Sequence, residues 1–467
     1  MKYNLIQKIE SSAFIVTIFL ILYVLIYNLF HYDPINGYDG IQHHAYVQNF
    51  LNLYVPGKTI YPSANFTSEF FSPPLPYILP AFVNEICKMY FPFENILETC
   101  QDIYSFVNII FQSLIYLCLL FLYMKIVKLS FKNKKLINIS VLLIIGLLTV
   151  NYKAIAMLRA ETYIIFLNGF LLYRFLVLIN KSFSYNKRDI FLFGTTIGLM
   201  ALSRQWAFLL FPAYFLIYFI IKKEYKLNYL KFLVITFFIG FLISSWFYIG
   251  LFIEYGSFTT FNQDSAPFSL KSQPLSFYIP IGDELHMLFT KPIRPYFKNQ
   301  FLPTLYADLW GDYWGYFSFT SLALDIGRNQ MMIGDYLARV NIVSLFPTFL
   351  LILGFKNSFK SLKIKEKLKI DYFNSYLVLA SLFSLFGFLW FLISYPSGDG
   401  DTNKGIYIIQ LFHLLGLMAV LFLEKIKKNN KKIYLGISLT LFITFLHNLS
   451  AMMSHFPQIE LFTKSLK

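Results

Sequence analysis

The chain is built from apolar stretches of about 15 to 25 residues, the length that crosses a hydrocarbon core as a helix. Short Lys-rich segments separate these stretches. Of the 467 residues, 57% are hydrophobic and only 14% are charged, so a soluble fold would expose apolar patches too large for solubility. The sequence therefore predicts an all-α polytopic membrane protein.

The basic segments predict the topology. If the N-terminus is cytoplasmic, every Lys-rich loop lies on the cytoplasmic side, as the positive-inside rule requires. The formal charge of +15 thus reflects topology, and we expect no nucleic-acid partner. The first apolar run has no small-residue cleavage site, so we expect it to be a retained helix and not a removed signal peptide. We expect about eleven spans in one transmembrane domain over 1–467. The composition, rich in Lys, Asn, Ile and Phe, is typical of an AT-rich genome and favours a bacterial cytoplasmic membrane. The expected spans are residues 11–30, 103–126, 136–151, 158–180, 189–203, 206–222, 228–252, 340–356, 372–395, 405–424 and 433–450.

Two external segments are long enough to form a site, loop one at 31–102 and loop two at 253–339. The interior of loop one, from Leu75 to Cys87, is apolar with few charges, as expected of a helix lying in the membrane interface. Cys87 and Cys100 share loop one and can pair in an oxidising compartment, although unpaired thiols fit the sequence equally well.

An acid follows the first span, at Asp39. Sugar transfer needs a carboxylate to take the acceptor's proton, cations to steady a leaving phosphate, and aromatic or polar groups to hold the sugar. Asp39 is the candidate base, the alternative being a helix-flanking acid that merely follows the charge asymmetry. His43 lies one helical turn further on the same face and is a candidate partner, and Glu69 is the next candidate carboxylate. Metal binding by His43 or His44 is a minority alternative, and we expect no cofactor.

Three external cations are candidates for binding a donor phosphate. Arg204 joins a short span to the next one, and a charge there must face a protein cavity or the interface because exposure to lipid is costly. Arg159 lies beside Glu161, so a buried ion pair is the alternative role. Lys404 lies where a lipid phosphate would be at the outer interface, with a local ion pair to Asp401 as its alternative.

Loop two contains a segment that mixes acids with aromatic rings, from Asp308 to Tyr316. Its residues Asp308, Trp310, Asp312 and Tyr313 are candidates for holding the sugar or the acceptor. The alternative is interfacial anchoring by the aromatic rings, which is common at membrane surfaces.

These features together resemble the GT-C superfamily of membrane glycosyltransferases. The nearest likeness is to the polyprenyl-phosphate-sugar enzymes of family 39, related to protein O-mannosyltransferases and lipid A aminoarabinose transferases. The resemblance implies two juxtamembrane helices in loop one, a polyprenyl-monophosphate sugar donor, inversion at the sugar, Asp39 as the catalytic acid residue, and Arg204 and Lys404 near the donor phosphate. It rests on Asp39, the loop Phe71 to Tyr77, the Arg159–Glu161 pair, the turn Ser203-Arg204-Gln205 and the segment Asp401 to Lys404.

One departure from the family concerns position 40. Many relatives carry Asp-Glu where this chain has Asp39-Gly40, so a second carboxylate must come from elsewhere, with Glu69 and Asp308 as candidates. The expected acceptor is a lipid, a glycan or a protein on the external face of the membrane. The sequence leaves two alternative functions. One is a transporter or lipid flippase, and the other is an O-antigen polymerase or ligase centred on Arg294 and Arg328.

Overall fold

In the residues that the structure, a computed structural model, describes, all regular secondary structure is helical. Eight of the described helices are long and apolar enough to cross a membrane, or nine if one bent pair counts as a span. The prediction of a polytopic helical membrane protein is thus confirmed, whereas the expected eleven spans are not reached among these residues. The described residues are 2–32, 35, 37–51, 67–90, 96–131, 138–280, 283–294, 296–318, 327–364, 366–396 and 402–455.

The shortfall comes from three short spans. The expected span 136–151 is broken into α6 (Ile139–Ile145) and α7 (Thr149–Ala156), which meet at 73°. The side chain of Asn151 donates to the carbonyl oxygen of Ile145 at 2.8 Å and so satisfies a backbone group freed by the bend. The spans expected at 189–203 and 206–222 form helical segments too short to cross a full hydrocarbon core.

The chain divides into two compact units. The first comprises residues 1–32, 120–153 and 265–467, and the second comprises residues 33–119 and 154–264. α5 (Ile96–Phe131) begins in the second unit and ends in the first.

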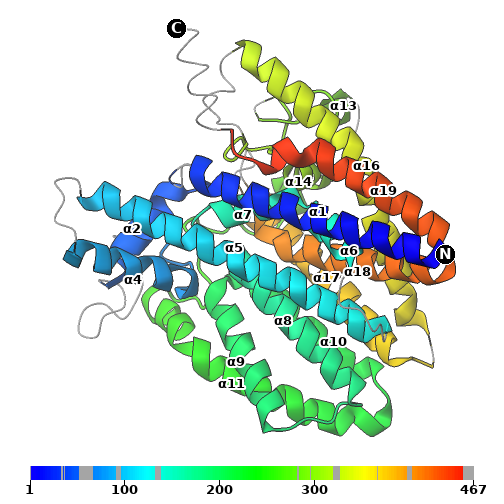
Figure 1. Cartoon of the computed structure of the whole chain (residues 1–467). Helices are drawn as coiled ribbons and strands as arrows, with labels where there is room; N and C mark the ends of the chain where they lie inside the picture. Colours follow the sequence, from blue (N-terminus) through cyan, green and yellow to red (C-terminus); the bar gives the residue numbers. More distant parts are fainter. Residues whose placement is uncertain are drawn as a thin grey trace. The chain divides into compact units, whose positions relative to one another are not determined.

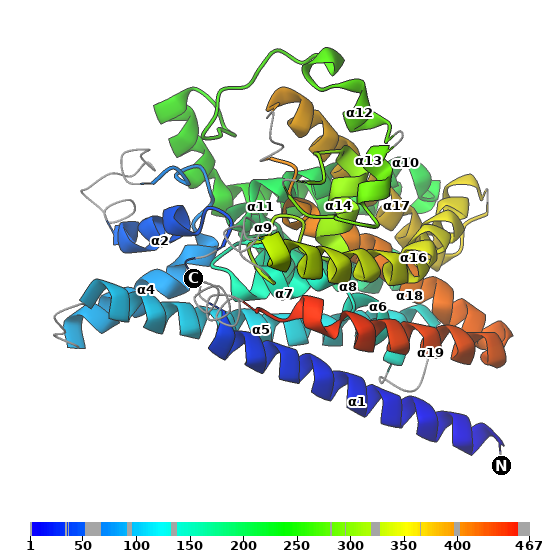
Figure 2. The ribbon, with the colours of Figure 1, turned by 90° about the horizontal axis from the view of Figure 1, so that it is seen from above.

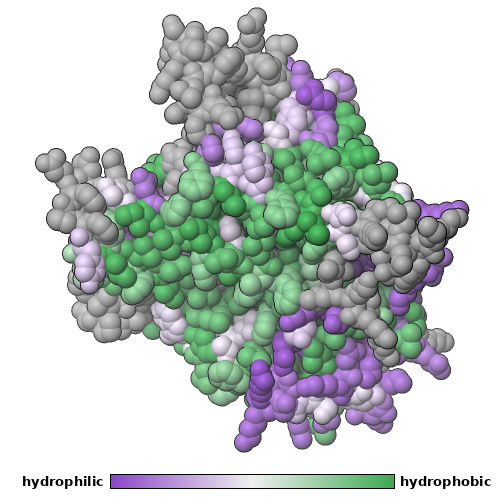
Figure 3. Space-filling view, in the orientation of Figure 1, coloured by the Kyte–Doolittle hydropathy of each residue, from purple (hydrophilic) through white to green (hydrophobic). Residues whose placement is uncertain are grey.

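The first unit is centred on α18 (Ile409–Asn429), which belongs to a candidate membrane span that is almost entirely buried. α16 crosses α18 closely, because a Cβ on Gly354 would come within 2.5 Å of the backbone nitrogen of Ala419. Figures 1 and 2 show α16 and α19 beside α18. On the face that carries α1, apolar side chains cover much of the surface, as a lipid-facing helix requires (Figure 3). The unit's other helices are α1 (Lys2–His31), η3 (Leu270–Ser272), α12 (Leu275–Tyr278), α13 (Asp283–Met287), α14 (Phe301–Trp310), α16 (Gly327–Lys363), α17 (Lys369–Ser394), η4 (Gly405–Ile408), α19 (Lys431–Asn448) and η5 (Leu449–Met452).

The second unit contains the described part of loop one. Two helices form there, α2 (Gly40–Gln48) and α4 (Leu75–Tyr90), in agreement with the two juxtamembrane helices that the resemblance implies. A disulfide between Cys87 and Cys100 joins α4 to α5, which decides between the paired and unpaired alternatives. The unit's other helices are α8 (Glu161–Asn180), α9 (Lys187–Ser203), η2 (Gln205–Leu210), α10 (Phe211–Ile220) and α11 (Lys223–Tyr255).

Candidate active site

Asp39 is the residue that starts α2. Its backbone is left-handed, with φ 53° and ψ 26°, and its side chain is exposed. The next residue has no space for a side chain, because a Cβ on Gly40 would lie 2.4 Å from the carbonyl oxygen of Ile35. The tight turn therefore leaves no space for a glutamate side chain at position 40.

Side-chain hydrogen bonds anchor the short helix α2 to α4, α5 and the loop before α4. His43 Nδ1 lies 2.7 Å from the hydroxyl of Tyr77 on α4, and His44 Nδ1 lies 2.7 Å from the hydroxyl of Tyr104 on α5. The hydroxyl of Tyr46 donates to the carbonyl oxygen of Ser72 at 2.9 Å. Both histidines are buried, so these contacts fix the orientation of α2 and with it the position of Asp39.

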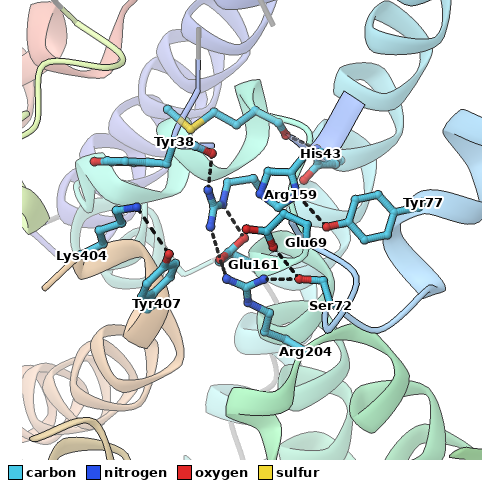
Figure 4. A network of polar contacts seen from close by, with 12 residues as sticks. Tyr38, His43, Glu69, Ser72, Tyr77, Arg159, Glu161, Arg204, Lys404 and Tyr407 are labelled. Atoms are coloured by element: carbon cyan, nitrogen blue, oxygen red, sulfur yellow. Dashed lines mark hydrogen bonds and ion pairs between the residues drawn. The ribbon is translucent and has the colours of Figure 1, made fainter. Parts of the chain in front are cut away.

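Two arginines share one buried carboxylate in the second unit (Figure 4). Arg159 Nε lies 3.2 Å from Glu161 Oε2, and an Arg204 nitrogen lies 3.3 Å from Glu161 Oε1. Arg159 also donates to the carbonyl oxygen of Tyr38 at 2.7 Å, next to Asp39. Two positive charges against one negative charge leave this triad with an excess of one positive charge.

Glu69 lies beside the triad and is buried. Ser72 Oγ donates to Glu69 Oε2 at 2.8 Å, and Arg204 donates to the same hydroxyl oxygen at 3.2 Å, so the serine links the carboxyl to the arginine. Burial raises the pKa of Glu69, Arg204 opposes this rise, and the negative charge of Asp39 adds to it. The two carboxyls that the sequence placed 30 positions apart therefore interact electrostatically, and Glu69 holds a proton more readily than an exposed glutamate does.

The first unit contains the other predicted site residues, among them Lys404 and Asp308. Lys404 Nζ lies 3.5 Å from the hydroxyl of Tyr407 and 5.9 Å from the centre of the Trp314 ring. Asp308 is fully buried, with Oδ1 2.5 Å from Lys153 Nζ and Oδ2 accepting from the backbone nitrogen of Gly405 at 2.7 Å. Both of its oxygens are thus committed to holding the first unit together.

The predicted aromatic platform lies in the interior of the same unit. Trp310 donates to Thr348 Oγ1 at 2.9 Å, and the hydroxyl of Tyr313 donates to the carbonyl oxygen of Phe297 at 3.0 Å. Asp312 accepts from the backbone nitrogens of residues 317 and 318. All three side chains are at most 1% exposed, so their placement favours a structural role in loop two over contact with a sugar.

Sequence reasoning missed Ser72 and the bridging position of Glu161. Ser72 belongs to the proline-rich loop already noted for its resemblance, yet a lone serine carries no signal for a link between Glu69 and Arg204. Glu161 was expected to pair with Arg159 alone. Among the described residues, no group of three or more His, Cys, Asp or Glu could hold a metal ion.

Comparison with known proteins supports the fold. No protein-family model matches the sequence. No curated protein matches it either. One similar solved structure is the Archaeoglobus fulgidus oligosaccharyltransferase in complex with Zn and sulfate, with 14% identity, a TM-score of 0.48, and coverage of 95% of this chain and 53% of that one. The same enzyme tethered to an acceptor peptide containing the NVT sequon through a disulfide matches at 14% identity and a TM-score of 0.50, covering 95% and 55%.

The chain spans about half the length of this oligosaccharyltransferase, and the likeness covers nearly all of the chain described above. The identity of 14% carries information on fold alone. The predicted membership of the GT-C superfamily and the finer likeness to family 39 therefore stay predictions. The chain has a fold similar to that of the Archaeoglobus fulgidus oligosaccharyltransferase.

Proposed function

We propose that the protein is an inverting glycosyltransferase that moves a sugar from a polyprenyl-phosphate donor to a lipid, glycan or protein acceptor on the external face of the membrane. The observation that carries the proposal is the arrangement in the second unit, where Asp39 and Glu69 interact beside a triad with one excess positive charge. Such a site combines a proton acceptor with charge suited to an anionic leaving group.

In the proposed reaction, the acceptor oxygen or nitrogen attacks the anomeric carbon of the sugar. The bond from that carbon to the phosphate oxygen breaks, and the electron pair leaves with the phosphate. Asp39 takes the proton released by the acceptor, because its carboxylate is exposed at the start of α2. The Arg159–Glu161–Arg204 triad offsets the negative charge that develops on the leaving phosphate.

Glu69 has a different proposed role from Asp39. Burial raises its pKa, so Glu69 holds a proton more readily than an exposed glutamate and competes less well with Glu161 for the two arginines. Ser72 links the carboxyl group of Glu69 to the guanidinium group of Arg204, because its hydroxyl contacts both side chains. Lys404, in the first unit, stays a predicted donor-phosphate residue.

The test is sugar transfer by purified protein from a panel of radiolabelled polyprenyl-phosphate sugars. Asp39→Asn should lower turnover by about 100-fold or more, the range for a general base, while donor binding persists. The matched control is Glu85→Gln, which removes an acid of α4 that forms a partly exposed pair with Lys88 at 2.9 Å. Turnover that survives Asp39→Asn, or falls equally in both variants, would contradict the assignment of the base.

One observation favours a second candidate function, a transporter. The bent pair α6 and α7 is a broken helix of the kind that transporters place at their binding sites. The buried His413 lies beside it, with Nε2 2.8 Å from Asn151 Oδ1. Flux of a labelled lipid or solute across vesicles, with no sugar release from any donor, would favour this candidate over the transferase.

A further inference from the structure

Loop two contains a segment in the first unit, residues 266–279, that exposes large apolar side chains outside any candidate span. The exposed fraction is 50–68% for Phe268, Leu270, Leu275 and Ile279. We call these residues the apolar edge. Because water disfavours a group of exposed apolar side chains, such a group marks contact with a partner or with a membrane.

Fixed contacts hold the apolar edge open. The hydroxyl of Tyr278 on α12 donates to the carbonyl oxygen of Leu270 at 3.0 Å, so the two halves of the segment close onto each other. Phe277, also on α12, is buried and packs against Phe301 of α14 with ring centres 6.0 Å apart. The segment is therefore folded onto the first unit through Phe277, while the apolar edge stays outside.

Hydrogen bonds attach the same segment to the last turn of α17. The donors are the backbone nitrogen of Ala266 at 2.8 Å, Ser272 Oγ at 3.1 Å and Gln273 Nε2 at 3.1 Å, and their acceptors are the carbonyl oxygens of Ser394, Ile393 and Leu392 in that order. Carbonyl groups in the last turn of a helix have no partner within the helix. The segment thus completes the end of α17 and is held at its depth.

The length of α17 gives that depth. α17 is a candidate membrane span of 26 residues, whereas about 20 residues cross a hydrocarbon core. Its terminal turns therefore extend into the interface between hydrocarbon and water. Trp390, one turn before Ser394, is exposed, and tryptophan is enriched at this depth in membrane proteins. The apolar edge belongs to a segment bonded to this interfacial turn.

We infer that the apolar edge inserts into the membrane interface at this end of α17 and anchors loop two to lipid. Lipid is the occupant in preference to a second copy or another protein, because the segment is bonded to the end of a span, where the bilayer already surrounds the chain. Lys271, next to Leu270, is exposed. Its ammonium group can reach lipid phosphates while its stem lies along the apolar side chains.

The anchor has a consequence for α14. Phe277 connects the segment to Phe301 at the start of α14, and α14 also carries Asp308 and Trp310. Contact between the apolar edge and lipid therefore fixes the depth of α14 relative to the bilayer. This inference does not depend on the proposed transferase function, because it uses only contacts within the first unit and the spanning length of α17.

The experiment measures the depth of a nitroxide label on the full-length protein in vesicles of phosphatidylcholine and phosphatidylglycerol. In a Cys118→Ala background, the label is attached at Leu275→Cys or, as the aqueous reference, at His286→Cys, because His286 on α13 is polar and exposed. Oxygen concentrates in the bilayer, whereas a nickel chelate stays in water. The ratio of oxygen to nickel collision rates should be several-fold higher at position 275.

Equal ratios at positions 275 and 286 would overturn the anchor. A label at position 275 that is shielded from both reagents would overturn it as well, because a protein surface, from a second copy or another partner, would then cover the apolar edge.

A pair of variants tests whether the apolar edge acts as a unit. Phe268→Ser/Leu270→Ser should lower the collision ratio of a label at Leu275→Cys several-fold, because less apolar surface remains to hold the segment in the interface. The matched control is Leu439→Ser/Ile443→Ser, which alters similarly exposed side chains on α19 and should leave the ratio unchanged. An unchanged ratio in the first variant, or an equal fall in both, would contradict the inference.

Discussion

The Cys87–Cys100 disulfide ties together the two helices that hold α2. Tyr77 on α4 and Tyr104 on α5 bind the two histidines of α2, and the disulfide joins α4 to α5. We expect Cys87→Ala/Cys100→Ala to destabilise the second unit. The cysteines are 13 positions apart, and closing a loop of that size stabilises a fold by about 3 kcal/mol through the entropy of the unfolded chain.

The assay has two readouts, thermal unfolding in detergent and the sugar transfer described above. A loss of about 3 kcal/mol should lower the midpoint of a unit in the 150–250-residue range by ~6–12 °C. Turnover should fall at temperatures below that midpoint, because α2 and Asp39 lose their fixed orientation before the spans unfold. The control is Cys118→Ala, which removes an exposed thiol outside the disulfide.

Equal unfolding midpoints of the double variant and of Cys118→Ala would contradict this prediction. A double variant with a lower midpoint that keeps full turnover up to that midpoint would contradict it as well. The first result would mean that the packing of α4 on its neighbours holds the loop without the covalent link. The second would mean that the two tyrosine–histidine contacts do not control the position of Asp39.

Three further predictions follow from the same unit. The pKa of Glu69 is raised in the folded protein, so the contribution of Glu69 to folding stability is greatest below the ordinary value of 4.5 and is lost as pH rises through the folded pKa; Glu69→Gln should remove this part of the pH dependence in thermal scans. Glu161→Gln should cost about 3–5 kcal/mol, because it leaves two guanidinium groups buried without their carboxylate, and an unchanged melting midpoint would contradict this. Gly40→Ala should lower turnover and stability, because its Cβ would meet the Ile35 carbonyl oxygen, whereas Gly436→Ala, which meets no atom within 4 Å, should be neutral or stabilising by up to about 1 kcal/mol.

The helical membrane fold could be predicted from the sequence because it depends on local composition. Apolar runs of spanning length and Lys-rich loops need no knowledge of tertiary contacts. The run at 136–151 is one exception, because its helix is bent where the side chain of Asn151 bonds to the Ile145 carbonyl oxygen. Hydropathy alone does not distinguish a bent pair from a straight span.

The candidate site was predicted in part. Asp39, Glu69, Arg159 and Arg204 were each chosen from the sequence, and the second unit contains all four. Their mutual contacts were not predictable, because they depend on the turn at Gly40 and on how the loop folds around Ser72.

Loop two shows the opposite case. Acids among aromatic rings fit a sugar site, an interfacial anchor and a buried core equally well in a sequence. The structure buries Asp308 in a pair with Lys153, 155 positions away, which favours a structural role. A pairing of such long range leaves no local pattern in either segment, so the sequence did not indicate it, and the sugar-binding role of Asp308 stays a prediction.

The left-handed backbone of Asp39 limits how this position can vary. Aspartate and asparagine adopt that conformation readily, and most other side chains do so at a cost of about 1 kcal/mol or more. Glutamate, the nearest chemical substitute for the base, would therefore change the backbone at the start of α2 as well as the length of the side chain. Asparagine removes the carboxylate but keeps the left-handed backbone of the turn. In a mutational library, position 39 should tolerate asparagine and glycine for folding, and a loss of activity can be assigned to chemistry in those two variants alone.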